Sequence, residues 1–178
     1  TKEALDEASL SKMVADLIDG WRKSAPAREQ QQLTAAAQEA VGETAWADLT
    51  TNSKDNLLAF FALQPRVEQE PQFARLAGLS LMMAFEKELR LALSRAGLRA
   101  EEVENLGRVL SRAYGFPETD NLHRIAAAAR KVNLDALRNR AAHGDEFSKH
   151  DLPTVADVLV KKGLDNKGLI GLVARYGR

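Results

Sequence analysis

The amino-acid sequence predicts an all-α protein, a helical bundle without a β-sheet. Apolar residues recur at helical spacing almost everywhere along the 178 residues. No run alternates apolar and polar residues for long enough to form a sheet, and no internal repeat is present. The prolines stand at the ends of apolar runs, where helices begin or end. With 45% hydrophobic and 28% charged residues, the chain fits one helical domain, with or without a helical extension.

Residues 1–44 are predicted to form an N-terminal helical extension, and residues 45–178 the main helical domain. The extension begins with an apolar stripe on one side of a helix, expected to be a docking face and made of Leu10, Met13, Val14, Leu17, Ile18 and Trp21, with Gly20 near its end. Pro26 can open a second helix that runs to about Val41. Because this helix is rich in Gln and Ala, we expect its burial to be shallow.

The main domain is predicted around one long helix. Ser53 and Asp55 are expected to cap a preceding helix that Pro65 stops. The longest apolar run then starts at Pro71 and is closed by Gly97. Since this run is apolar on more than one face, we expect residues 71–96 to form the central and most buried helix.

Four further helices are predicted after the central one. They lie over residues 99–113, over 121–143 with a break near Asn133, from about Pro153, and over the last ten residues. Asn133 is expected to cap the second half of the helix that it breaks, and Gly144 to end that half. The segment 114–121 is rich in helix breakers and is expected to be a loop.

Composition excludes several classes of protein. Without cysteine there is no disulfide framework, zinc ribbon, iron–sulfur cluster or thiol nucleophile. No apolar run is long enough to span a membrane and no secretory signal is present, so we expect a cytoplasmic protein.

Charge is unevenly distributed along the chain. Lys plus Arg equals Asp plus Glu at 25 each, but residues 121–178 hold eleven basic and six acidic side chains. That third of the chain is the expected anion-binding end. The chain begins at Thr1 rather than Met, which suggests a segment of a longer protein.

Two segments look like ligand-binding motifs but lack residues that those motifs require. Gly163 and Gly168 have the spacing of a phosphate-binding loop, but the Lys and Ser or Thr that should follow are missing. The densest group of potential metal ligands lies at 143–150 and comprises His143, Asp145, Glu146 and His150. It contains no pair of His at the i, i+4 spacing of a helical zinc site, and Gly144 breaks the helix between its members. We therefore expect neither a metal nor a cofactor. With 6% aromatic residues, no basic surface interleaved with aromatic side chains is apparent.

The segment 137–144 is chemically the densest part of the chain. It places Arg138, Asn139, Arg140 and His143 at the end of a helix, with small Ala residues between them. Guanidinium groups bind phosphate, and imidazole transfers protons near neutral pH. Asn139 and His143 share a helix face, whereas Arg138 lies about 140° from His143 around the helix. The segment is therefore a candidate catalytic site for phosphate chemistry.

Arg138-Asn139-x-x-x-His143 resembles the R-x4–6-H signature of HEPN-domain proteins, and the long helix before it is similar too. The resemblance covers about residues 45–160. It implies a metal-independent endoribonuclease that acts on RNA as a homodimer with one composite site. By direct match Arg138 and His143 would be catalytic, with Asn139 holding the geometry and Arg140, in a variable position, binding substrate phosphate.

In this interpretation the domain serves as a toxin or as the effector of antiviral defence. Its partners would be an upstream sensor domain or an antitoxin-type protein.

Other interpretations remain open. The chain could be a non-catalytic HEPN-like module for dimerisation, partner docking or nucleotide binding, including the partner of a separate nucleotidyltransferase. Arg138 and Arg140 could simply pair with Asp135 or Asp145 while His143 caps its helix. His123 and His150 are expected to be ordinary surface or helix residues.

Overall fold

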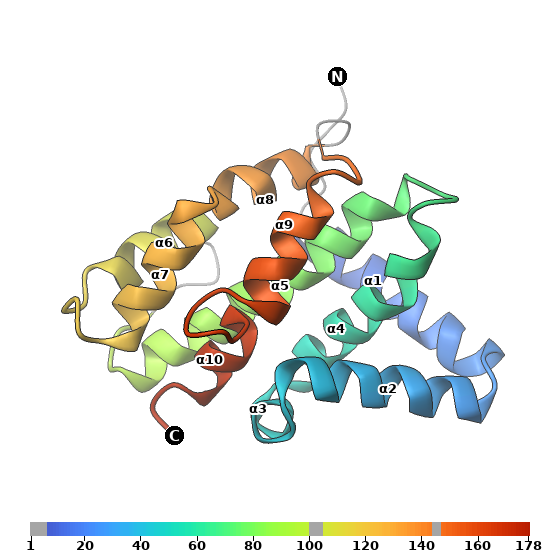
Figure 1. Ribbon diagram of the computed structural model, residues 1–178, viewed down its shortest axis with the longest axis horizontal. Helices are drawn as coiled ribbons and strands as arrows, with labels where there is room; N and C mark the ends of the chain where they lie inside the picture. The colour runs from blue at the N-terminus through green and yellow to red at the C-terminus, as the bar shows by residue number, and fades with distance from the viewer. Residues whose placement is uncertain (1–6, 100–104, 144–146) are drawn as a thin grey trace.

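The computed structural model describes residues 7–99, 105–143 and 147–178, and this part of the chain is all-α, without a strand (Figure 1). The helices are α1 (Glu7–Ser24), α2 (Ala27–Val41), α3 (Glu43–Asp48), α4 (Thr51–Leu63), α5 (Phe73–Arg95), α6 (Leu106–Tyr114), α7 (Asn121–Lys131), α8 (Leu134–Ala142), α9 (Leu152–Ala156) and α10 (Leu169–Arg175). A 3-10 turn at Gln64–Arg66 follows α4, and a π-helical turn at Asp157–Lys161 extends α9. None of the described helices is both long and apolar enough to cross a membrane.

Helix α5 is the centre of the fold, as predicted. It runs through the middle of the molecule, and α4, α8, α9 and α10 all pack against it (Figure 1). Most of its residues are buried, including Phe85 and Leu89 at 0% exposure. The helix ends beside Gly97, whose φ of +84° is a left-handed conformation that glycine adopts at no steric cost.

The N-terminal helices build a second, smaller core on α4. Helices α1 and α2 contribute Val14, Ile18 and Ala37, which pack with Leu58 and Ala59 of α4. The docking stripe is narrower than predicted, because Met13 is 43% exposed, and α1 continues past Gly20 to Ser24. That α1 and α2 form an extension separate from residues 45–178 stays a prediction.

Several helix ends differ from the sequence prediction. Thr50, rather than Ser53 or Asp55, caps α4, since its Oγ1 accepts a hydrogen bond from the Ser53 amide at 3.1 Å. The Asp55 carboxylate instead pairs with Arg22 of α1 at 2.9 Å. Asn133 does break the chain between α7 and α8, with φ of +52°, but its side chain makes no capping bond.

Two predicted features fall partly or wholly outside the described residues. The helix expected over 99–113 is observed as α6 from Leu106, and residues 100–104 are not described. Gly144 is not described either. The 115–120 segment joins α6 to α7 without a helix, as the breakers there predicted.

Candidate functional site

Helix α8 carries Arg138, Asn139 and Arg140, and His143 is its C-cap. The contact of α8 with α5 orients these residues. Leu134, Leu137 and Ala141 are buried, so one face of α8 packs inward and the others stay accessible. The His143 backbone amide donates to the Asn139 carbonyl at 3.0 Å, which makes His143 the last residue held by the helix. The side chains of Asn139 and His143 are both exposed.

Arg138 points inward, toward the central helix. Its Nε lies 3.5 Å from Oε2 of Glu86 on α5, and the two side chains are 12% and 4% exposed. The same carboxylate accepts a 2.8 Å hydrogen bond from Nη2 of Arg90, one turn further along α5. The Arg138 guanidinium itself makes no hydrogen bond to any described residue, and its Nε is buried. Arg138 is therefore held by charge attraction while its N–H donors remain unused.

Arg140 turns toward the segment that follows α8. Its Nη2 donates to Oδ1 of Asp151 at 3.2 Å, in a partly exposed pair. The second oxygen of Asp151 accepts from the Ser148 amide at 3.0 Å, so Asp151 links Arg140 to the turn before α9. Neither arginine pairs with Asp135, in contrast to the alternative that the sequence left open, and Asp145 lies outside the described residues.

Arg75 of α5, which the sequence did not single out, binds the end of α8. Its Nε donates to the Ala141 carbonyl at 2.5 Å and its Nη2 to the Ala142 carbonyl at 2.9 Å. These carbonyls belong to the last turn of the helix, where four acceptors lack a partner within the helix and the dipole is negative. Arg75 thus fixes the helix end from which His143 projects.

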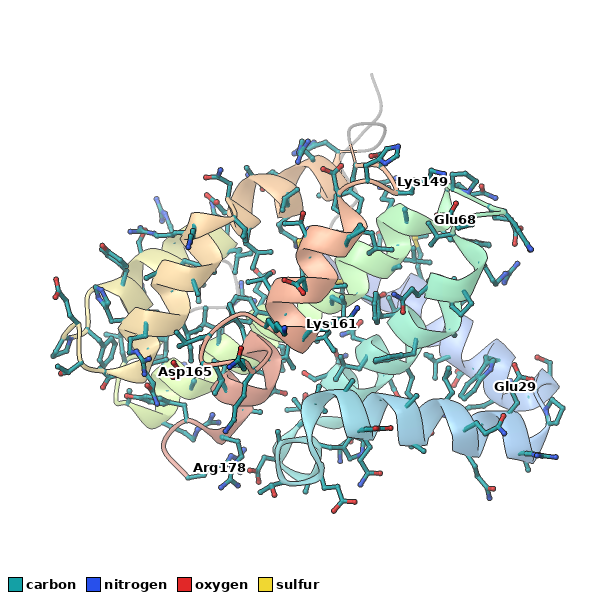
Figure 2. All side chains as sticks on the ribbon, in the orientation of Figure 1. Glu29, Glu68, Lys149, Lys161, Asp165 and Arg178 are labelled. Atoms are coloured by element: carbon teal, nitrogen blue, oxygen red, sulfur yellow. The ribbon has the colours of Figure 1, made fainter. Side chains whose placement is uncertain are left out.

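A hollow of about 460 Å³ lies beside this helix end. It is lined by Pro71, Gln72, Arg75, Phe147, Ser148, Lys149 and His150. Lys149 pairs with Glu68 at 3.2 Å, and Figure 2 shows the two side chains next to each other at one edge of the molecule. Phe147 packs directly over Gly78 of α5, so a Cβ at position 78 would come within 2.5 Å of the ring. Arg75 and Lys149 therefore place positive charge at the hollow, and Phe147 packs its wall against α5.

The four candidate residues do not converge within one chain. Arg138 faces α5, Arg140 faces Asp151, and Asn139 and His143 are exposed. No side-chain hydrogen bond or ion pair joins any two of the four in the described structure. No group of three or more metal-ligand residues occurs within the described ranges, and Asp145 and Glu146 lie outside them. The arrangement offers an exposed imidazole, unused guanidinium donors and nearby cations, which together suit proton transfer and anion binding.

Sequence reasoning missed Glu86, Arg90 and Arg75. A signal was present for the first two, because a Glu and an Arg four residues apart inside an otherwise apolar run indicate a buried ion pair on one helix face. No comparable signal marked Arg75, whose partners are backbone carbonyls far along the chain.

Comparison of the chain with protein-family models, with curated proteins and with solved structures finds no match. We therefore infer its function from the side chains and their arrangement.

Proposed function

We propose that the protein is a metal-independent endoribonuclease of the HEPN type that cleaves RNA through attack by a 2′-hydroxyl group. The observation that carries the proposal is the state of Arg138, which Glu86 holds in an ion pair while its guanidinium makes no hydrogen bond to a described residue. Unused donors on a fixed guanidinium suit the oxygens of a phosphate. The exposed imidazole of His143 stands at the end of the same helix.

The proposed reaction needs no group beyond these side chains and the RNA. The 2′-oxygen attacks the adjacent phosphorus as its proton passes to a base, and the bond from phosphorus to the 5′-oxygen breaks as that oxygen receives a proton. The products are a 2′,3′-cyclic phosphate and a 5′-hydroxyl end. His143 takes or gives the proton, Arg138 stabilises charge on the phosphoryl oxygens, Asn139 holds the geometry and Arg140 binds substrate phosphate.

One chain has a single His143 for two proton transfers, so the proposed active species is a homodimer. The exposed face of α8 that carries Asn139 and His143 would meet its copy at a two-fold axis, where both imidazoles reach one phosphate. The positive charges of Arg75 and Lys149 at the neighbouring hollow would attract the RNA backbone toward this axis.

The proposal is tested by incubating the purified protein with mixed single-stranded RNA in excess chelator. We expect cleavage to persist, and every new 3′ end to carry a cyclic phosphate, because a metal-activated water would leave a linear one. The same RNA with a 2′-O-methyl group at every position lacks the nucleophile and should stay intact. Cleavage of that RNA, or no cleavage of any RNA by the wild-type chain, would contradict the proposal.

A second candidate function is a non-catalytic helical module. The burial of Arg138 favours it, since an arginine whose side chain is only 12% exposed and paired with Glu86 also serves to hold α8 on α5. In that case the exposed end of α8 is a surface for dimerisation or for a partner. Dimers that bind RNA but never cut it would support this candidate.

In its cellular role we propose a toxin or an antiviral defence effector. Cleavage of cellular RNA must be controlled, and an upstream sensor domain or an antitoxin-type partner would supply that control.

A further inference from the structure

Three planar side chains lie against one another where α6 meets α7. The rings of Tyr114 and His123 are stacked, with centroids 4.3 Å apart and planes 27° apart. The guanidinium carbon of Arg130 lies 4.4 Å from the centroid of the Tyr114 ring. His123 and Arg130 are two turns apart on α7, and Tyr114 comes from the end of α6. We call these three residues the α6–α7 stack.

Hydrogen bonds hold two members of the α6–α7 stack, His123 and Arg130, in place. His123 Nδ1 lies 2.7 Å from the Tyr114 carbonyl and 3.1 Å from the Phe116 carbonyl. Because both partners are carbonyl oxygens, Nδ1 is the protonated nitrogen. Arg130 Nη2 donates to Ser111 Oγ at 2.9 Å, a bond that orients the plane of the guanidinium. The stack is therefore rigid before any ligand arrives, and little ordering entropy is lost on binding.

The α6–α7 stack is also open to solvent. Tyr114 is 42% exposed, which is unusual for a large aromatic side chain in the described part of this protein, and Arg130 is exposed as well. No described carboxylate pairs with Arg130. Arg108 and Lys131, on the same two helices, are exposed and form no ion pair within the described residues. A rigid aromatic and guanidinium surface, on two helices that also carry exposed cations, suits unpaired nucleobases and their phosphates.

We propose that the α6–α7 stack is a docking platform for single-stranded RNA, on which unpaired bases stack while Arg108 and Lys131 attract the phosphates. The proposal rests on the proposed ribonuclease function only for the choice of RNA as the nucleic acid. Single strands fit better than duplexes, because bases inside a duplex have no free face to stack. The sequence alone could not indicate this platform, because only folding brings Tyr114, His123 and Arg130 together.

The test measures binding of a fluorescein-labelled 12-nucleotide 2′-O-methyl RNA of mixed sequence by fluorescence anisotropy. This probe cannot be cut by 2′-hydroxyl attack, so binding is read independently of whether the protein is a ribonuclease. We expect Tyr114→Leu and Arg130→Lys each to weaken binding about tenfold, because each removes a planar surface while keeping bulk or charge. The slope of affinity against salt should stay that of the wild type. Lys131→Ala should instead lower the slope by about one unit.

Two comparisons separate base stacking from binding through the phosphates alone. A 12-nucleotide probe with abasic sites at most positions should bind the wild type and Tyr114→Leu equally, because only phosphates remain to be bound. The exposed Arg28→Lys change on α2 is the matched control for Arg130→Lys and should leave binding unchanged. Thermal melting of each variant checks that the helical hairpin is intact, and Arg130→Lys keeps the test valid if Tyr114→Leu does not fold.

Wild-type affinity of both variants for the probe would overturn the platform. If their melting temperatures fell at the same time, the role of the stack would be to stabilise the packing of α6 on α7. Failure of the wild type to bind the probe would overturn it too, even if RNA cleavage were observed. Tight binding of the probe by a protein that never cuts RNA would keep the platform and remove the ribonuclease.

Discussion

Arg138 Nε lies 3.5 Å from Oε2 of Glu86, and both side chains are almost fully covered where α8 packs on α5. The candidate arginine therefore has a structural task as well as the proposed chemical one. A guanidinium in this position orients α8 relative to the central helix, and with it the exposed Asn139 and His143.

Arg138→Ala should destabilise the fold, because it removes one partner of a buried pair. We expect a loss of about 3 kcal/mol in the free energy of unfolding, at the low end for buried pairs since Glu86 keeps its bond to Arg90. Urea denaturation measures the loss. Arg138→Met should lose less, because the methionine fills the space of the arginine stem while Glu86 keeps its bond to Arg90. Arg140→Ala is the control and should change stability by less than about 1 kcal/mol, since its pair with Asp151 is partly exposed.

The helical framework could be predicted from the sequence because its signals are local. The apolar run that follows Pro71 shows that α5 is enclosed on several faces, and Asn133 marks the break between α7 and α8. What could not be predicted depends on contacts between distant segments. Nothing local shows that Arg75 binds the end of α8, or that Phe147 covers Gly78.

The sequence singles out the segment of the candidate site but does not predict which way its side chains point. Helical spacing places Arg138 away from His143, yet only the packing of α8 decides that Arg138 faces inward. The same limit applies to His123, which the sequence suggested was an ordinary residue and which packs on Tyr114. Side chains on one helix have a fixed angular order, but which of them meets a neighbour depends on how that helix is rotated in the fold.

Arg75→Ala should loosen the end of α8. It removes two charge-assisted hydrogen bonds to the last-turn carbonyls, so we expect a loss of about 1–2 kcal/mol in unfolding free energy. Cleavage of RNA should fall more steeply than stability alone explains, because His143 projects from that turn. The matched control is Arg28→Ala, an exposed arginine with no such contact, which should leave both quantities near wild type. Full activity in folded Arg75→Ala protein would show that the cap does not position the site.

Gly78→Ala should displace Phe147. The added Cβ would lie 2.5 Å from the ring, and relief of such overpacking costs about 1–3 kcal/mol. Because Phe147 precedes the Ser148–Asp151 turn that holds Arg140, substrate affinity should also fall. The double variant Gly78→Ala with Phe147→Leu makes room and should recover stability, which denaturant melts of the three proteins can measure. If the single change is harmless, the ring does not anchor this turn.

Tyr176 gives the fold a pH dependence on the alkaline side. Burial raises the pKa of Tyr176, and the 3.1 Å hydrogen bond from its hydroxyl to Asp120 raises it further. The folded state therefore keeps the proton more tightly than the unfolded state, so the contribution is complete below about pH 10 and is lost as pH rises through the folded pKa. The unfolding free energy of the wild type should fall toward that of Tyr176→Phe across this range. Parallel curves for the two proteins would contradict the assignment.

A composite site in a dimer has a distinct kinetic signature. His143→Ala should lower RNA cleavage by about a hundredfold or more, the scale for removing a proton-transfer group, while stability stays near wild type because the imidazole is exposed. The exposed Arg28→Ala change on α2 should keep the wild-type rate. If both imidazoles of a dimer serve one phosphate, an equal mixture of wild-type and His143→Ala chains, allowed to exchange, should retain about a quarter of the full rate. Independent sites would retain about half, since each wild-type chain would then work alone. A value near one half would remove the composite site while leaving His143 catalytic, and unchanged cleavage by pure His143→Ala protein would remove the ribonuclease assignment itself.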